Sequence, residues 1–272
     1  MDNRPIGVFD SGLGGLTAVK EITRLLPHED IIYCGDTGRV PYGGRSRETI
    51  KCYVSQAINF LLKFDIKLIV IACGTASAAA KEIFGNYPVP VIGVVEPSAA
   101  AVVKSTRNGK IGVTATQASI GIGEYERKII ELMPSAAVIS RAAPLFVPLV
   151  ENGYIKPGDR ITELAVEDSL RDIREYGIDT LLLGCTHYPL LSGFIKDYMG
   201  GGVKLIDSGA ETVSYVKNIM VNQDILNTGT NSGSLNIYVS DATENFSNIS
   251  SMFLEKKLDG IVNTVDLNRF AT

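Results

Sequence analysis

Short apolar runs alternate with longer stretches of helical periodicity along most of the chain. The runs with the length and β-branched content of buried strands are residues 6–10, 30–36, 67–73, 89–97, 109–116, 136–143, 179–185 and 203–209. Amphipathic patterns predict helices over residues 15–27, 47–65, 161–177 and 211–220. Near-continuous apolar strands followed by helices are typical of parallel sheets that are covered on both faces. The sequence therefore predicts an α/β fold with parallel sheets.

A weak internal repeat divides this pattern into two halves. IGVFDSGLGGLTAV at residue 6, the strand that ends in Cys73, and VVEPSA at residue 94 are followed by IGVTATQASIGIGE at residue 111, the strand that ends in Cys185, and LIDSGA at residue 205. Similar landmarks in the same order predict two pseudo-symmetric parallel-sheet α/β domains that face each other across a central cleft.

The tail carries a further strand candidate over residues 235–241 and a helix candidate over 244–258. We expect it to pack back on the first half of the chain. The expected domains are therefore residues 1–97 plus 208–272, and residues 98–207.

Composition excludes several classes of partner. The net charge of −4 leaves no basic surplus to neutralise phosphates, so no nucleic acid is expected. No apolar stretch reaches the ~18 residues of a membrane helix, and the start lacks a secretion signal, so we predict a cytoplasmic protein without a membrane partner. Cys34, Cys52, Cys73 and Cys185 are then expected to be thiols. With no C-x-x-C pair and two histidines, no metal site is expected.

Cys73 and Cys185 each end a predicted strand immediately before a helix or turn. Ligands of open parallel sheets bind outside the carboxyl ends of the strands, and a nearby helix N-terminus favours a thiolate. For Cys34 and Cys52 we prefer the interpretation of a small buried hydrophobe. Two facing domains would place Cys73 and Cys185 on opposite walls of one cleft. One thiolate could then remove a proton from a carbon while the opposing thiol returns one to the other face, inverting a stereocentre.

Several segments together make the chain similar to a known family. They are IGVFDSGLGGLT (6–17), GDTGRVPYG (35–43), IACGTASA (71–78), VIGVVEP (91–97), LLLGCTHYPLL (181–191) and IDSGAET (206–212). This set resembles the glutamate racemases of the aspartate/glutamate racemase superfamily, which use no cofactor. The resemblance implies an isomerase that interconverts L- and D-glutamate, supplies D-glutamate for the peptidoglycan of bacterial cell walls, and forms a homodimer.

The same resemblance implies roles for individual residues. Cys73 and Cys185 would be the proton-transfer thiols, with Asp10 assisting on the Cys73 side and His187 and Glu151 on the Cys185 side. Hydroxyls of Thr75 and Thr186 would meet the α-carboxylate, while Ser11 and the Tyr42–Gly43 backbone would receive the side-chain carboxylate. The full set of expected substrate contacts is Asp10, Ser11, Pro41, Tyr42, Gly43, Gly74, Thr75, Thr116, Ser119, Thr186 and His187. Asp10 could instead be a turn residue that caps the following helix, and the two roles are compatible.

One position departs from the family pattern. The family normally has Asn directly after the first cysteine, where this chain has Gly74. Glycine keeps the backbone N–H but lacks the amide, which would leave room for a water. A lost hydrogen bond to a charged group costs about 1.5–3 kcal/mol. We therefore expect activity on glutamate with weakened substrate binding.

Alternative functions stay open at this stage. Within the superfamily these are an aspartate or hydantoin racemase, or a decarboxylase that uses one cysteine. From other classes, a non-catalytic protein that binds small acidic ligands would fit if Gly74 marks lost activity. A redox protein would require a disulfide between Cys73 and Cys185.

Overall fold

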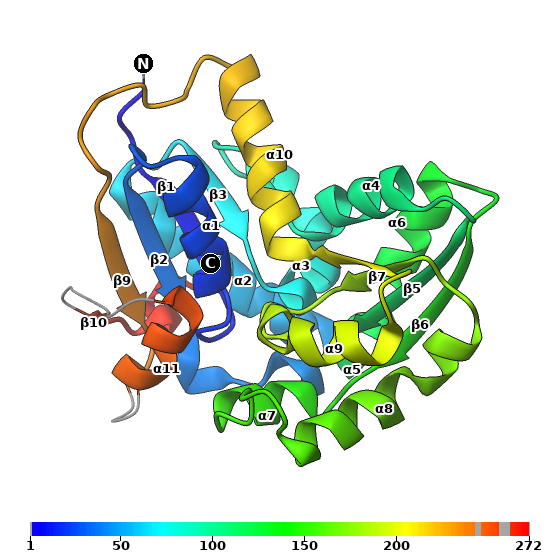
Figure 1. Ribbon diagram of the computed structural model, residues 1–272. Coiled ribbons are helices and arrows are strands. Elements are labelled where there is room, and N and C mark those ends of the chain that lie inside the picture. The colour runs from blue at the N-terminus through cyan, green and yellow to red at the C-terminus, as the bar shows by residue number, and fades with distance from the viewer. Residues whose placement is uncertain (1, 243–245, 256–261, 272) are drawn as a thin grey trace.

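The chain forms two separate parallel β-sheets, each flanked by helices, in a computed structural model that describes residues 2–242, 246–255 and 262–271 (Figure 1). The six-stranded sheet has the order β10-β9-β2-β1-β3-β4, and the four-stranded sheet has the order β6-β5-β7-β8. The strands are β1 (Ile6–Asp10), β2 (Ile31–Gly35), β3 (Leu68–Ile71), β4 (Val91–Gly93), β5 (Lys110–Ala115), β6 (Ala137–Ala142), β7 (Thr180–Leu183), β8 (Lys204–Asp207), β9 (Leu235–Val239) and β10 (Val262–Thr264). The predicted α/β class is confirmed.

Helices and 3-10 turns connect these strands. The α-helices are α1 (Leu16–Leu25), α2 (Arg47–Leu61), α3 (Gly74–Ala80), α4 (Val95–Ser105), α5 (Gln117–Ile122), α6 (Glu124–Leu132), α7 (Phe146–Glu151), α8 (Arg160–Glu175), α9 (Ser192–Met199), α10 (Ser208–Asn222) and α11 (Phe246–Leu254). The 3-10 turns are η1 (Thr37–Arg39), η2 (Tyr42–Gly44), η3 (Leu62–Phe64), η4 (Lys81–Asn86), η5 (Tyr188–Leu191) and η6 (Leu267–Phe270).

The two sheets repeat one topology. The order β2-β1-β3-β4 in the first sheet matches β6-β5-β7-β8 in the second, with every pairing parallel. The tail adds β9 and β10 to the free edge of β2, in a register that pairs Ile31 with Leu235. This shared order supports the repeat seen in the sequence, whereas the boundaries at residues 97 and 207 stay a prediction.

One predicted strand is partly wrong. Residues 89–97 form a strand only over Val91–Gly93, and α4 begins at Val95. Pro97 lies in the first turn of α4, where its missing N–H removes no intrahelical bond. In the tail, the strand predicted over 235–241 appears as β9. Of the helix predicted over 244–258, residues 246–254 form α11, while residues 244, 245 and 256–258 lie outside the described residues.

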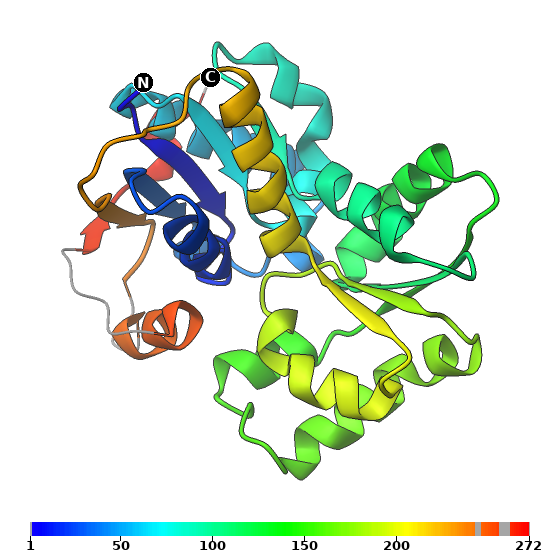
Figure 2. The ribbon, with the colours of Figure 1, turned by 45° about the horizontal axis from the view of Figure 1, so that its top comes forward.

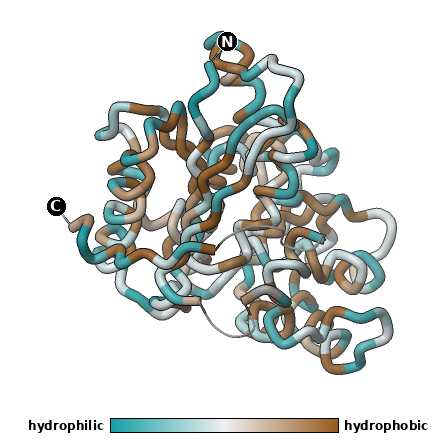
Figure 3. Tube along the Cα trace, turned by 90° about the vertical axis from the view of Figure 1, so that its left-hand side faces the viewer, coloured by the Kyte–Doolittle hydropathy of each residue, from teal (hydrophilic) through white to brown (hydrophobic). Residues whose placement is uncertain are grey.

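Burial on both sheet faces explains why the strands read as uninterrupted apolar runs. All residues of β1 and β3 are buried. Figure 2 shows two lobes, with α10 continuing from β8 across to the first lobe. Helix α10 packs against α1 of the first lobe and against α4, which packs on β7 and β8 of the second. In Figure 3, hydrophobic stretches of the trace run through the middle of the molecule.

The amino ends of the first sheet enclose a buried ion pair. Lys67 Nζ lies 2.5 Å from Glu29 Oε2, and both side chains are at most 1% exposed. The ammonium also donates to the carbonyl of Ile225, and the Asn227 N–H donates to Glu29 Oε1. This pair ties the tail to the sheet at the end opposite the cavity described below. No helix in the described part of the chain is long and apolar enough to cross a membrane.

Candidate active site

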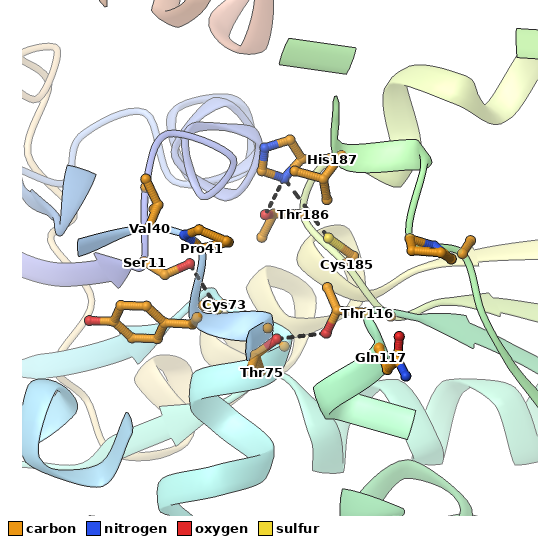
Figure 4. A pocket seen from close by; sticks show the side chains of 18 of the residues that line it. Ser11, Val40, Pro41, Cys73, Thr75, Thr116, Gln117, Cys185, Thr186 and His187 are labelled. Atoms are coloured by element: carbon orange, nitrogen blue, oxygen red, sulfur yellow. Dashed lines mark hydrogen bonds between the residues drawn. The ribbon is translucent and has the colours of Figure 1, made fainter. Parts of the chain in front are cut away.

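A cavity of about 400 Å³ lies between the two lobes, at the carboxyl ends of the strands. From the first lobe it is lined by Ser11 and Gly12 after β1, Val40–Gly43 after β2, and Cys73–Thr75 after β3. From the second lobe it is lined by Thr116, Gln117, Ala143, Pro144, Val147, Pro148, Glu151 and residues 184–187. Cys73 and Cys185 face this space from different lobes (Figure 4). Its volume falls within the range typical of small-molecule sites.

Cys73 occupies the N-cap position of α3. Its Sγ accepts a hydrogen bond from the Ala76 N–H at 3.4 Å and lies 3.3 Å from Ser11 Oγ. Burial raises the pKa of this thiol to about 12, and the charge of nearby Asp10 acts in the same direction. The contacts with Ser11 and Ala76 oppose that rise. Cys73 is therefore a protonated thiol at neutral pH.

Asp10, the last residue of β1, lies behind the cavity wall rather than in it. Its carboxyl is 1% exposed, and Oδ2 accepts from the Gly12 N–H at 2.8 Å. Oδ1 has no hydrogen-bond partner within the described residues, and burial raises the pKa of the carboxyl. Asp10 thus holds the turn after β1, while α1 begins at Leu16 without a side-chain cap. The structure places its charge near Cys73 and gives it no place in the cavity lining.

Cys185, His187 and Glu151 form a chain of contacts on the second lobe. His187 Nδ1 lies 3.9 Å from Cys185 Sγ, and Nε2 lies 3.2 Å from Glu151 Oε1. Burial by itself lowers the pKa of the imidazole. The contacts with Cys185 and Glu151 outweigh burial and raise the pKa to about 10. A protonated His187 therefore places a positive charge beside the sulfur of Cys185.

Three hydroxyls from the two lobes form a hydrogen-bonded triangle at the floor of the cavity. Thr75 Oγ1 lies 2.8 Å from Thr116 Oγ1 and 3.1 Å from Ser119 Oγ, which are themselves 2.9 Å apart. Thr116 caps α5, which fixes its hydroxyl at the end of β5. Thr75 and Thr116 line the cavity, whereas Ser119 lies behind them. A hydroxyl can turn its proton toward a new acceptor, so this triangle can accept an anion.

The Tyr42 side chain is 2% exposed and points into the core rather than at a ligand. Its hydroxyl donates to Asp36 Oδ2 at 2.5 Å, and Asp36 also accepts from Arg39 Nε and Ser240 Oγ. This network anchors the loop that brings Pro41 and Gly43 to the cavity wall. The arrangement supports a contribution from backbone rather than from the phenol.

The expectation of a water-sized space beside Gly74 is wrong. A Cβ placed on Gly74 would lie 2.3 Å from the Gly184 carbonyl oxygen and 2.9 Å from the Tyr125 hydroxyl oxygen. The space of a side chain is thus filled by the second lobe. Gly14 makes a similar close approach, because a Cβ there would lie 2.6 Å from the His187 ring.

Several lining residues have no counterpart in the sequence predictions. Gln117 and the apolar group Val40, Ala143, Pro144, Val147 and Pro148 belong to this set. The four of these residues that follow β6 are Ala143 and Pro144 in the connection and Val147 and Pro148 in α7. Cys52 also differs from expectation because it is exposed on α2, whereas Cys34 is buried as predicted. All four cysteines are free thiols. Among the described residues, no group of three or more His, Cys, Asp or Glu side chains could hold a metal ion.

Comparison with known proteins places this geometry in a family. The model of the Asp/Glu/hydantoin racemases matches residues 6–216. The chain belongs to the Asp/Glu/hydantoin racemase family. Among relatives of this racemase, the glutamate racemase of Streptococcus pneumoniae serotype 19F (strain G54) is 45% identical over 261 residues, which cover 95% of this chain and 97% of the relative.

Solved structures extend the likeness to the fold. The glutamate racemase of Francisella tularensis, determined with D-glutamate, has a TM-score of 0.91 and 37% identity, covering 99% of this chain and all of that one. A glutamate racemase isoform of Bacillus anthracis has a TM-score of 0.93 and 38% identity, covering 98% of this chain and 99% of its own. The family resemblance found in the sequence of this racemase is therefore confirmed.

Proposed function

We propose that this racemase-family protein interconverts L- and D-glutamate by proton transfer between the α-carbon and two thiols. The observation that carries the proposal is the placement of Cys73 and Cys185. They follow the equivalent strands β3 and β7 and line one cavity from different lobes. Inversion needs a proton handler on each face of the substrate, and two facing thiols supply both. The chemistry calls for no cofactor.

The two thiols lie in different electrostatic environments. Cys73 holds its proton because burial raises its pKa to about 12, while a protonated His187 lies 3.9 Å from Cys185 Sγ. The Cys185 thiolate can remove the α-proton of one enantiomer, and the Cys73 thiol can donate its proton to the opposite face of the carbanion. After this step Cys185 is the thiol and Cys73 the thiolate. That state acts on the other enantiomer, and exchange with solvent restores the first.

The cavity offers hydrogen-bond donors for the two carboxylates of glutamate. The hydroxyls of Thr75 and Thr116 can donate to a carboxylate, at the cost of reorienting the triangle that they form with Ser119. Ser11 and the backbone of Tyr42 and Gly43 are suited to a second carboxylate on the opposite side. Once turned toward the substrate, these donors stabilise the developing charge of the carbanion, which offsets the weak basicity of a thiolate.

The biological setting follows from the same proposal. We propose that the product D-glutamate serves peptidoglycan synthesis, that the enzyme works in the cytoplasm, and that it acts as a homodimer. Analytical ultracentrifugation tests for the homodimer, which should have twice the molar mass of one chain. A monomer with full activity would contradict this proposal.

Racemisation measured by circular dichroism tests the proposed function. The reduced protein, without added cofactor, is expected to convert L-glutamate and D-glutamate to the same mixture. Cys73→Ser and Cys185→Ser are each expected to lose this activity, while Cys52→Ser, at an exposed site outside the cavity, keeps it. Aspartate is the matched alternative substrate. Turnover of aspartate but not of glutamate would replace the proposal with aspartate racemisation. A folded protein that binds glutamate without turnover would indicate a binding protein.

A further inference from the structure

Gly74 and Gly184 make a direct contact between the two lobes. Gly74 is the first residue of α3, and Gly184 follows β7. A Cβ on Gly74 would lie 2.3 Å from the Gly184 oxygen and 3.4 Å from its carbonyl carbon, whereas real Cβ atoms stay at least 3.0 Å from their neighbours. The obstacle is backbone, so no side-chain rotation can relieve it. The two lobes can come this close only because residue 74 has no side chain.

Both sides of this contact are held in place. The Gly184 N–H donates to the Thr114 carbonyl at 2.8 Å, and its own carbonyl accepts from the Tyr125 hydroxyl at 3.3 Å. The Tyr125 ring lies close behind Gly184, within 3.0 Å of where a Cβ of that glycine would be. On the first lobe every residue of α3 is buried. Neither backbone can retreat without moving the element that carries it.

The contact residues are bonded directly to the two thiol residues. Gly74 follows Cys73, and Gly184 precedes Cys185. A change in the Gly74–Gly184 separation therefore changes the separation of the thiols by a similar amount. Proton transfer depends steeply on such distances, and a displacement of about 1 Å can lower a catalytic rate about 100-fold.

We propose that Gly74 is a positioning residue, whose contact with the Gly184 carbonyl sets the separation of the Cys73 and Cys185 thiols. The inference rests on the proposed racemase function and deepens it. Gly74 in this account acts through the lobe contact, not through a missing substrate hydrogen bond. The two explanations differ in which kinetic constant they change.

Gly74→Ala is the primary test. The added Cβ would lie 2.3 Å from the Gly184 oxygen in the present arrangement, so the two backbones must separate until that distance is at least 3.0 Å. We therefore expect kcat to fall about 10- to 100-fold while KM for glutamate stays within about threefold. Helix propensity favours alanine over glycine, so the backbone itself gives no reason for a loss. Gly193→Ala in α9 is the matched control, because nothing lies within 4 Å of its added Cβ. It is expected to keep wild-type kcat.

Gly74→Asn distinguishes the effect of the lobe spacing from the effect of the missing amide side chain. If Gly74 matters only as a missing hydrogen-bond donor, restoring the family's usual residue lowers KM at unchanged kcat. The spacing account predicts a lower kcat instead. A lower KM with an intact kcat would overturn it.

Tyr125→Phe keeps the inference testable if the Gly74 variants fold poorly. Loss of its hydroxyl frees the Gly184 carbonyl, which is expected to lower kcat a few-fold in the wild-type background. In the Gly74→Ala background the same change makes room beside the Cβ and is expected to raise kcat. Additive losses, or a Gly74→Ala enzyme with wild-type kcat, would refute the inference. Absence of turnover in the wild-type protein would instead refute the proposed function.

Discussion

His187 is expected to keep its proton through neutral pH, with Cys185 as the main cause. Burial alone lowers the pKa of this imidazole, but its contacts with Cys185 at 3.9 Å and Glu151 at 3.2 Å raise it to about 10, against an ordinary value of 6.5. At about 1.4 kcal/mol for each pKa unit, this difference amounts to about 5 kcal/mol in favour of the imidazolium. Cys185 and Glu151 contribute unequally to this rise in the pKa of His187.

The solvent exposure of Glu151 and Cys185 determines how much each raises the pKa of His187. The Glu151 side chain is 47% exposed, and water screens such ion pairs to about 1 kcal/mol or less. Glu151→Gln is therefore expected to lower the pKa of His187 by less than about one unit. Cys185 is 7% exposed and carries the remainder. Cys185→Ser removes the sulfur contact while burial persists, so the pKa of His187 should fall further than in Glu151→Gln.

Nuclear magnetic resonance of the imidazole groups between pH 5 and 11 measures these values directly. The chain has two histidines, so His28→Gln assigns both sets of signals. In the wild-type protein, the signal of His187 is expected to titrate near pH 10. Titration of His187 near pH 6.5 in the wild type would refute the reasoning. An unchanged pKa in Cys185→Ser, or a larger fall in Glu151→Gln than in Cys185→Ser, would refute the assignment of the cause.

Three further outcomes follow from other contacts. Thr75→Val removes one hydroxyl of the triangle and is expected to raise KM for glutamate about tenfold or more, since a hydrogen bond to a charged group contributes about 1.5–3 kcal/mol. A KM within twofold of wild type in steady-state assays would contradict this expectation. Glu29→Gln leaves Lys67 buried without its counter-charge and is expected to lower the free energy of unfolding by about 3–5 kcal/mol in urea titrations; an unchanged midpoint would contradict the role of the pair. Iodoacetamide at pH 7.5 is expected to label exposed Cys52 before Cys73, whose pKa is raised to about 12, and peptide mass mapping that finds Cys73 labelled first would contradict its buried thiol form.

The strands were predictable from sequence because a strand that is buried on both faces has apolar residues at nearly every position. β1 and β3 are buried throughout, so their apolar runs are uninterrupted. The run over 89–97 failed because a buried strand and the buried first turn of a helix look alike, and only packing decides that α4 begins at Val95. β10 has three residues, too few to show any period.

The candidate site was predictable where the chemistry follows strand ends. Cys73 and Cys185 lie at such ends, and parallel topology brings those ends together. The depth of a side chain below the cavity surface was not predictable. Asp10 ends β1 and Ser119 lies in α5, yet neither reaches the cavity lining. The apolar wall around Val147 depends on how α7 packs beside the cleft, which no local sequence pattern encodes. The contact at Gly74 likewise depends on a residue of the other lobe.

Exchange of the α-proton in heavy water, followed separately for L- and D-glutamate, tests the two-thiol account most directly. With Cys73→Ser and Cys185→Ser in place of the wild type, the account predicts that each variant loses racemisation yet retains slow exchange with one enantiomer. The enantiomer should be opposite for the two variants, because each remaining thiol faces one side of the α-carbon. Racemisation that persists in either variant, or exchange of the same enantiomer in both, would contradict two thiols acting from opposite faces.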